Sequence, residues 1–250
     1  MDVESAAELL DGAHLRGVLL EAVDVRVGGL AAAYGVQDAL TARRIARGAT
    51  RVGWKLGYTS AVMRAQMGIS EPNFGPLLSS MLVDAVDDRF VQPRVEPEIA
   101  LVLGSDPGPG AGIDDVLGAC RSARVALEVV DSVWTGYSFD LEHNTADGSS
   151  AAGVVLGEVI PLDRLDEVAV TMQVDGVEVA HGRGADASGH PALGIAWLSA
   201  RLAERGLALH DGDVVITGGL TAAYPLDRGS TVAATFAHDG FGSRTVEVSR

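Results

Sequence analysis

The chain has 250 residues, and 47% of them are hydrophobic, enough to bury the core of one large domain or of a domain with a helical arm. We expect the second arrangement. With 34 acidic and 19 basic residues, the formal net charge is −15, which excludes nucleic acid and anionic membranes as favourable partners because their phosphates would be repelled over most of the surface. An anionic small molecule can still bind where a metal ion or a few cations make a pocket locally positive.

The cysteine content and the N-terminal segment indicate a reducing compartment. Cys120 is the only cysteine of the sequence, so an internal disulfide is excluded. Residues 1–16 are acidic and interrupted by charges, unlike the basic start and apolar run of a signal peptide. No apolar run approaches the length of about 18 residues that a membrane span needs. We therefore expect a cytoplasmic protein.

The first 50 residues predict a helical region. Between Glu4 and Arg47 the apolar residues recur at helical spacing, interrupted at Gly28 and Gly29, which indicates two or three helices. From residue 51 the character changes to short β-rich runs. We therefore divide the chain into an N-terminal helical region, residues 1–50, and a strand-rich domain, residues 51–250.

The second part of the chain predicts strands separated by turns. Eight segments are rich in β-branched and apolar residues and bounded by Gly, Pro and Asp; they read VGWKLGYTS, VEPEIALVLG, RVALEVVDS, GVVLGEVIPL, VAVTMQVDGVEVA, DVVITGG, STVAATFAHDG and TVEVS. Asp175-Gly176 predicts a hairpin turn. Helices are expected near IDDVLGACRSA and HPALGIAWLSARLAERG. Without a regular β-helix-β rhythm, this pattern favours an α+β fold with a curved mixed sheet or β-roll over a nucleotide-binding sheet.

Glu96 and Glu98 are the first candidate metal ligands. They are two residues apart within an apolar run, so on a strand both carboxylates point to one face while Val95 and Ile99 point to the other. Like charges side by side repel unless they are solvated or share a cation, and hard oxygen ligands are those that Mg²⁺ and Mn²⁺ take. The alternative is an edge strand with a wet face.

Glu128 is the third candidate ligand. Its apolar neighbours in VALEVVDS predict a strand that is buried on both sides, where a carboxylate is costly unless it is paired or metal-bound. Asp131 is a competing ligand, although at the strand end it could equally cap a turn.

Lys55 is the candidate for proton transfer. It is the only lysine among 19 basic residues and lies between Trp54 and Leu56, outside any charged run. A chain that uses arginine everywhere else is expected to retain lysine where a compact, titratable ammonium is needed. We expect desolvation to lower its pKa and suit it to proton transfer; the alternative is a lysine whose stem merely packs on Trp54.

Other motifs are less specific. The Gly/Ser loop from Asn144 to Gly153 could bind a carboxylate through backbone N–H groups, or be only a turn. Arg183 could clamp a carboxylate or lie exposed at a hairpin end. The sequence contains no G-x-S-x-G, HExxH or CxxC motif, so serine-hydrolase, zinc-protease and redox functions have no support.

Seven ordered segments resemble the family of 2-keto-4-pentenoate (2-hydroxypenta-2,4-dienoate) hydratases and 4-oxalocrotonate decarboxylases, within the fumarylacetoacetate-hydrolase fold superfamily. They lie between about Arg51 and Gly242 and read VGWKLGYTS, MGISEPNFGPL, QPRVEPEIALVL, ALEVVDS, TADGSS, GHP and VITGGLTAA. The resemblance implies a curved β-roll behind an N-terminal helical region, and a homo-oligomer.

The same resemblance implies the site. In that family an E-x-E pair and a later glutamate hold Mg²⁺ or Mn²⁺, and these positions correspond to Glu96, Glu98 and Glu128, while the catalytic lysine corresponds to Lys55. TADGSS and VITGG are expected to line the pocket, which adds Ser149, Ser150 and Thr217 as substrate-binding candidates beside Arg183 and Ser79.

Two departures from the family pattern concern the predicted reaction. Where hydratases read P-D-F-G-x-L-x-D-x-M, this chain reads PNFGPLLSSM from Pro72 to Met81, so the later aspartate, expected in the active site, becomes Ser79. Where the family reads A-D-N-A-S, this chain reads ADGSS from Ala146 to Ser150, without the side-chain amide.

The predicted function is that of a metal-dependent lyase. We expect a small 2-oxo acid to chelate the metal through its carboxylate and C2 carbonyl oxygens, with Lys55 moving or orienting a proton of the enolate, before hydration or decarboxylation. The alternatives are an oxaloacetate-type decarboxylase or C–C hydrolase of the same superfamily, and a non-catalytic metal-binding relative. A hydrolase needs an activating base, and His14 is the only histidine upstream of Lys55.

Overall fold

The computed structural model describes the backbone of residues 1–250 and all side chains except those of residues 62, 63 and 67. The N-terminal region forms α1 (Val3–Arg16), a 3₁₀ turn (Ala22–Asp24) and α2 (Leu30–Ala46). The Asp2 carboxylate accepts a hydrogen bond from the Ser5 backbone N–H and caps α1. At the other end Gly17 adopts φ 61°, the left-handed conformation that commonly ends a helix. The predicted helical region is therefore present.

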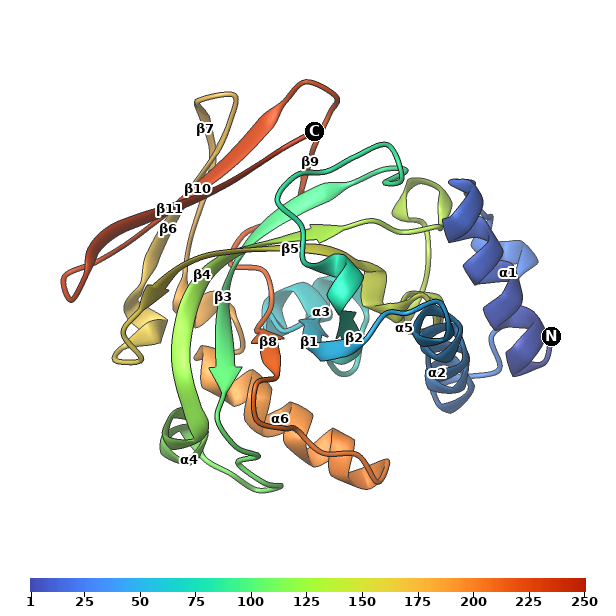
Figure 1. Ribbon diagram of the computed structural model, residues 1–250, viewed down its shortest axis with the longest axis horizontal. Helices are drawn as coiled ribbons and strands as arrows, with labels where there is room; N and C mark the ends of the chain where they lie inside the picture. Colours follow the sequence, from blue (N-terminus) through green and yellow to red (C-terminus); the bar gives the residue numbers. More distant parts are fainter.

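A seven-stranded sheet forms the centre of the molecule. Its main path runs β2-β1-β8-β3-β4-β5, and β9 pairs with β3. The strands are β1 (Arg51–Gly57), β2 (Asn73–Leu78), β3 (Arg94–Leu103), β4 (Cys120–Val130), β5 (Ala151–Ile160), β8 (Val214–Ile216) and β9 (Tyr224–Pro225). Because β1 and β8 are parallel and the other pairs are antiparallel, the sheet is mixed, and Figure 1 shows its strong curvature along β3, β4 and β5.

A second sheet of four strands closes the other side of the core. Its order is β11-β10-β6-β7, with β6 (Ala169–Val174), β7 (Val177–Arg183), β10 (Thr231–His238) and β11 (Gly242–Ser249). Asp175 (φ 50°) and Gly176 (φ 78°) both adopt positive φ between β6 and β7, which a two-residue hairpin turn with matching twist requires. The predicted hairpin is confirmed.

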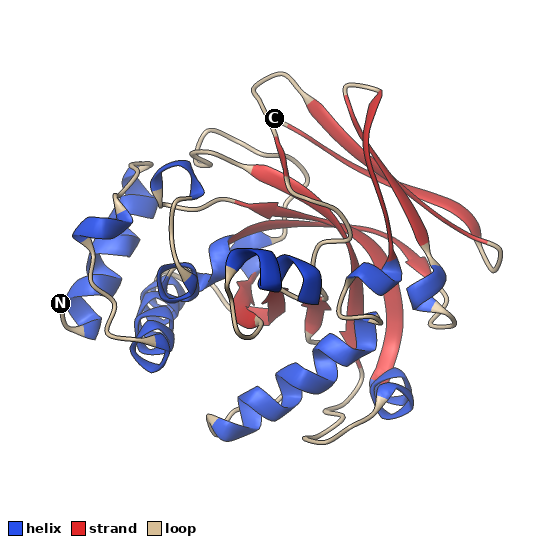
Figure 2. Ribbon diagram, turned by 180° about the vertical axis from the view of Figure 1, so that it is seen from behind, coloured by secondary structure: helices blue, strands red, loops and turns tan.

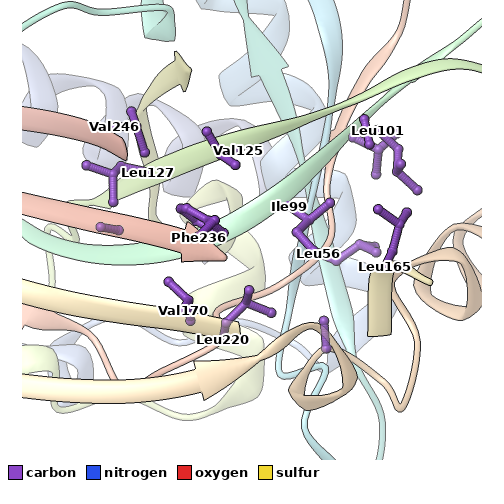
Figure 3. Close-up of a cluster of buried hydrophobic side chains, with 14 of the residues drawn as sticks. Leu56, Ile99, Leu101, Val125, Leu127, Leu165, Val170, Leu220, Phe236 and Val246 are labelled. Atoms are coloured by element: carbon purple, nitrogen blue, oxygen red, sulfur yellow. The ribbon is translucent and has the colours of Figure 1, made fainter. Parts of the chain in front are cut away.

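The main hydrophobic core lies between the two sheets. Leu56, Ile99 and Leu127 from the large sheet meet Val170 and Phe236 from the small one (Figure 3), and all five side chains are at most 2% exposed. The strands of the large sheet thus have one apolar face turned to this core. The expected α+β class with a curved mixed sheet is confirmed.

Four further α-helices connect the strands along the chain, namely α3 (Ala61–Met67), α4 (Ile113–Ala119), α5 (Leu141–Ala146) and α6 (Pro191–Glu204). Figure 2 shows the helices in blue around the sheets. The helix expected over residues 113–123 ends at Ala119, because the chain from Cys120 already pairs with β3. Strand β2 was not predicted; it contains Gly75 and Pro76, which the edge of a sheet tolerates. The short β9, α3 and α5 were missed as well.

The N-terminal helices share a second core with the rest of the chain. Ala6, Leu10 and Leu40 pack in one buried cluster with Trp134 and Ala146. A boundary near residue 50 therefore marks the change from helix to strand, while the packing crosses it, and the division into two folding units stays a prediction. Over the residues that the structure describes, no helix has the length and apolarity to cross a bilayer.

The second core generates a stability prediction. Leu10 is 0% exposed and Leu15, on the same helix, is 66% exposed. We expect Leu10→Ala to lower the free energy of unfolding by about 2–5 kcal/mol because it opens a cavity, and Leu15→Ala to change it by less than about 0.5 kcal/mol. Urea unfolding followed by tryptophan fluorescence measures both. A small effect for Leu10→Ala would show that the N-terminal helices contribute little to global stability.

Candidate metal centre and active site

The register between β3 and β4 brings the three predicted glutamates together. Glu96 lies directly opposite Glu128, and Glu98 lies two residues further along β3 on the same face. Carboxylate oxygens of all three, one from each residue, lie within 4.8 Å of one another. Val95 and Ile99, on the opposite face of β3, belong to the main core. The alternative of a wet edge strand is wrong, because β3 is paired on both sides.

Burial makes this cluster costly without a counter-charge. Glu98 and Glu128 are 0% exposed, and like charges on directly paired strands repel. Desolvation and the neighbouring carboxylates raise the pKa of Glu96 to about 7 and that of Glu98 well above its usual range. Desolvation likewise raises the pKa of Glu128. The cluster therefore favours uptake of positive charge.

The oxygen atoms of the cluster fit a divalent cation. Glu98 Oε2 accepts a hydrogen bond of 2.7 Å from the Gly218 N–H, but the buried Oε1 of the same residue has no hydrogen-bond partner among the described atoms. A buried oxygen without a partner is expensive, and carboxylate oxygens are the ligands that hard cations such as Mg²⁺ and Mn²⁺ take. The neighbouring Gly219 leaves room for this cluster as well, because a Cβ atom there would displace the Glu96 carboxylate from its position.

Lys55 extends from β1 to the same cluster. Its side chain is 6% exposed, and Nζ lies 3.2 Å from the Glu128 carboxylate. Burial acts to lower the pKa of Lys55, but the charges of Glu128, Glu96 and Glu98 outweigh it and raise the pKa. The expectation of a lowered pKa is therefore wrong for the metal-free protein. A divalent charge on the three carboxylates would oppose this rise, since bound cations are the largest local charges of such sites.

A cavity of about 710 Å³ opens beside the cluster. Lys55 and Glu96 lie in its wall, together with Arg94, Tyr58, Tyr137, Asn144, Ser149, Ser150 and Gly219. Glu96 of the carboxylate cluster and Lys55 thus border a space of the size that small-molecule sites have.

Backbone strain is concentrated at this cavity. Seven non-glycine residues in the described part of the chain have positive φ, and four of them line the cavity, namely Tyr58 (φ 54°), Tyr137 (φ 61°), Ser149 (φ 58°) and Ser150 (φ 56°). Each such conformation costs on the order of 1 kcal/mol or more, and strain of this kind clusters at functional sites. The distribution points to the same cavity as the carboxylate cluster.

A buried polar network fixes the serine loop. Asn73 Nδ2 donates to Asn144 Oδ1 (2.8 Å), and Ser149 Oγ donates to Asn73 Oδ1 (2.9 Å). Asn144 Nδ2 in turn donates to Ser150 Oγ (2.9 Å). Asn73 stands where the hydratase pattern P-D-F-G has aspartate, and this departure was visible in the sequence. Its connection to the cavity became apparent only from these contacts.

Comparison with known proteins identifies the family. The family model of the fumarylacetoacetate (FAA) hydrolase C-terminal domain matches residues 55–249. The chain belongs to this family. A 4-oxalocrotonate decarboxylase of Pseudomonas sp. (strain CF600) is 37% identical to it over 213 residues, 82% of this chain and 80% of that protein. A 2-keto-4-pentenoate hydratase of Paraburkholderia phymatum is 35% identical over 219 residues, 84% of this chain and 83% of that protein.

A solved structure extends the likeness to the whole chain. It is the 4-oxalocrotonate decarboxylase from Pseudomonas putida G7 complexed with magnesium and adipate, with a TM-score of 0.91 and 33% sequence identity over 99% of this chain and 96% of that one. The expected family and its fold are confirmed. The magnesium of that complex and the carboxylate cluster of this chain together support a divalent-metal site.

Several predicted residues of this family member lie elsewhere. Ser79 is exposed and belongs to a second cavity, beside His14, where its Oγ accepts a hydrogen bond from the Thr50 N–H. The expected loss of an active-site carboxylate at position 79 therefore does not touch the Lys55 cavity. The Thr217 side chain is buried and donates to the Ile99 carbonyl, so it holds β3 rather than lining the cavity.

The contacts of Arg183 and Asp131 place both residues outside the proposed site. The exposed Arg183 ends β7 and does not line the cavity. The Asp131 carboxylate accepts hydrogen bonds of 2.7 Å from the Val91 and Gln92 N–H groups and is outside the glutamate cluster. Ser149 and Ser150 are the substrate-binding candidates that the fold does bring to the cavity.

The carboxylate cluster predicts that Glu98→Gln does not lower the stability of the metal-free protein but removes the stabilisation by metal. We expect Mg²⁺ or Mn²⁺ at about 100 times its Kd to raise the free energy of unfolding by about 2.7 kcal/mol. Glu98→Gln removes one repelling charge, so the metal-free variant should be at least as stable as the unmodified protein, and it should lose this response to metal. Thermal unfolding with and without the ion measures both effects. Glu158→Gln, on a side chain that is 67% exposed, is the control and should keep the response; a full response in Glu98→Gln would contradict the site.

The raised pKa values predict that protons compete with the metal. Because metal binding requires ionised carboxylates and the pKa of Glu96 is about 7, affinity should fall as the pH decreases from about 8 to about 6. Isothermal titration calorimetry with Mn²⁺ at both pH values measures this change. Equal affinities would show that these carboxylates are already ionised at the lower pH.

Proposed function

We propose that this protein is a divalent-metal-dependent lyase that acts on a small 2-oxo acid, as a hydratase or a decarboxylase. The observation that carries the proposal is the convergence of Glu96, Glu98 and Glu128 beside Lys55 at one cavity. The relatives named above support the class, because they are hydratases and decarboxylases of such acids, and one of them is a magnesium complex.

In this proposal the three glutamates hold Mg²⁺ or Mn²⁺. When bound, the ion supplies Lewis-acid stabilisation of the negative charge that develops on the C2 oxygen of a 2-oxo acid. The protein contributes the fixed geometry: β3 and β4 are central, hydrogen-bonded strands, so the carboxylates need no rearrangement before the reaction. It also contributes local neutralisation, which a protein of net charge −15 needs to admit an anionic substrate.

Lys55 is the proposed proton-transfer group. Its ammonium Nζ is held by Glu128 and borders the cavity, so it can deliver a proton to, or hold one at, a carbon next to the developing enolate. Ser149 and Ser150 are proposed to orient the substrate, since the network through Asn73 and Asn144 fixes their positions.

Contacts in the structure weaken the C–C hydrolase alternative. His14 Nε2 lies 2.6 Å from Asp147 Oδ1 and borders the second cavity, away from Lys55. The histidine expected to activate water for a hydrolase is therefore not placed for it. A non-catalytic metal-binding relative remains the outcome to test against, and it predicts metal binding without turnover.

We further propose that the protein works in the cytoplasm as a homo-oligomer. A single cysteine fits a reducing compartment. Leu15 and Val23, two apolar side chains near the N-terminus, are 66% and 87% exposed, which is consistent with a surface covered in an assembly. Light scattering after size-exclusion chromatography determines the oligomeric state, and a monomer at micromolar concentration would contradict the assembly.

The activity itself is tested by absorbance. The purified protein with Mg²⁺ is incubated separately with 2-hydroxypenta-2,4-dienoate and with 4-oxalocrotonate, and the ultraviolet absorbance of each substrate is followed. Loss of the first chromophore indicates a hydratase, and conversion of the second with release of CO₂ indicates a decarboxylase. Metal binding with neither reaction would support the non-catalytic alternative.

Substitution of Lys55 tests the proton-transfer role. We expect Lys55→Arg to keep the fold and the metal-induced stabilisation but to lower turnover by about 10²–10⁴-fold, because a guanidinium stays protonated and cannot act as a proton donor and acceptor in turn. Lys55→Met is the second variant, for the case that the larger guanidinium does not fit. Circular dichroism and the thermal shift with Mg²⁺ control for folding, and undiminished turnover in both variants would remove Lys55 from the mechanism.

A further inference from the structure

Arg94 is a cation of the cavity to which the proposed reaction assigns no role. It lies on β3 two residues before Glu96 and on the same face, so its Cα atom is about 6–7 Å from that of Glu96 along the strand. Its side chain lines the cavity together with Lys55 and Glu96. The alternation that places Glu96 and Glu98 on one face of β3 also places Arg94 there, and Arg94 was not among the predicted site residues.

A rigid platform holds the Arg94 guanidinium. Its central carbon lies 4.2 Å from the centroid of the Tyr137 ring, a distance at which a guanidinium is attracted to the ring face. Tyr137 is itself fixed, because its hydroxyl lies 3.0 Å from both the Gln92 and Val130 carbonyl oxygens. The planar fork is thus positioned without using its N–H donors.

Those donors have no partner within the described part of the chain. Arg94 takes part in none of the ion pairs or side-chain hydrogen bonds found among the described side chains, and none of its nitrogens is a buried atom that lacks a partner. Its N–H groups therefore face the open cavity. A guanidinium with free donors matches the two oxygens of a carboxylate.

The charged side chains of the cavity wall other than Arg94 have partners. Three glutamates are matched by Lys55 and one divalent ion, so the proposed centre is neutral before substrate enters. Of the other ionisable side chains in the cavity wall, His181 is 2.8 Å from Glu178, and the Asp186 carboxylate accepts a hydrogen bond from the Arg183 N–H. Arg94 is thus a cation of the cavity wall that has neither an ion pair nor a side-chain hydrogen bond among the described residues, and a carboxylate at the far end of a substrate can supply that partner.

We propose that Arg94 binds the distal carboxylate of the substrate, and that this protein acts on dicarboxylic 2-oxo acids. The inference rests on the proposed function, because the 2-oxo end must be held at the metal for the distal end to reach Arg94. It makes Arg94 a specificity-determining residue: it touches the substrate at the end opposite the reacting carbonyl and adds affinity that a monocarboxylic analogue cannot use.

Two acids that differ only in the distal group test this inference. 2-Oxoadipate and 2-oxohexanoate have the same chain length and the same chelating end, and only the first has a second carboxylate. Their binding to the Mg²⁺-loaded protein is measured by isothermal titration calorimetry. We expect 2-oxoadipate to bind about 10- to 100-fold more tightly, the range of a hydrogen bond to a charged group.

Variants of Arg94 assign the preference to this residue. Arg94→Met should reduce the affinity for 2-oxoadipate to that for 2-oxohexanoate and leave the latter unchanged, and Arg94→Lys should retain part of the preference because it keeps the charge without the fork. Arg89→Met is the matched control, since Arg89 also lies over an aromatic ring, that of Phe90 at 5.1 Å, but borders the second cavity. It should bind both acids as the unmodified protein does.

The outcomes separate this inference from the function on which it rests. Equal affinities for the two acids, or a preference that survives in Arg94→Met, would overturn the role of Arg94 and leave the metal-dependent lyase standing. If neither acid binds while the metal does, the proposed function fails, and the role of Arg94 fails with it.

Discussion

The mutual repulsion of three buried carboxylates is the constraint on which the rest of this structure depends. Glu96 and Glu128 face each other across paired strands, and Glu98 is their neighbour on the same face. No chain would retain this arrangement for stability alone, because burial penalises each charge and the charges repel one another. The arrangement is explained when a divalent ion and the ammonium of Lys55 neutralise it.

The fold supplies what this charge cluster needs. The opposite faces of β3 and β4 lie against the main core, which is formed with the second sheet, so the strands that hold the glutamates cannot easily move apart. The chain after β8 turns through two glycines: the Gly218 N–H donates a hydrogen bond to Glu98, and Gly219 leaves space for the Glu96 carboxylate. Rigid strands and compact turns together preorganise a site that bulk water would otherwise screen.

Different parts of the cavity wall contribute different groups. One end is defined by the carboxylates and Lys55, and the adjoining wall by the strained serine loop and the network of Asn73 and Asn144. Arg94 on its tyrosine platform provides a further positive charge in the cavity wall, two residues before Glu96 on the same face of β3. With a divalent ion on the glutamates, this cavity can admit an anion although the protein as a whole is acidic, because the ion, Lys55 and Arg94 offset the local negative charge.

Local patterns in the sequence determined the helical N-terminus, the α+β class, most strands, the pairing of Glu96 with Glu98 on one face, and the special position of Lys55. Each of these follows from short-range periodicity or from residue usage, so no knowledge of distant contacts was needed. The motifs also carried the family resemblance, which the comparisons confirmed.

Only the tertiary structure decided which distant residues meet. Strand register places Glu128 opposite Glu96. Ser79 and His14 line a second cavity, and the Thr217 hydroxyl bonds to the backbone of β3. The tertiary structure also reversed the expected shift in the pKa of Lys55, because that shift depends on three charges that lie far from it in the sequence. The physical reason is common to all of these: the energy of a buried charge or polar group is set by its neighbours in space, and strand pairing and packing choose those neighbours.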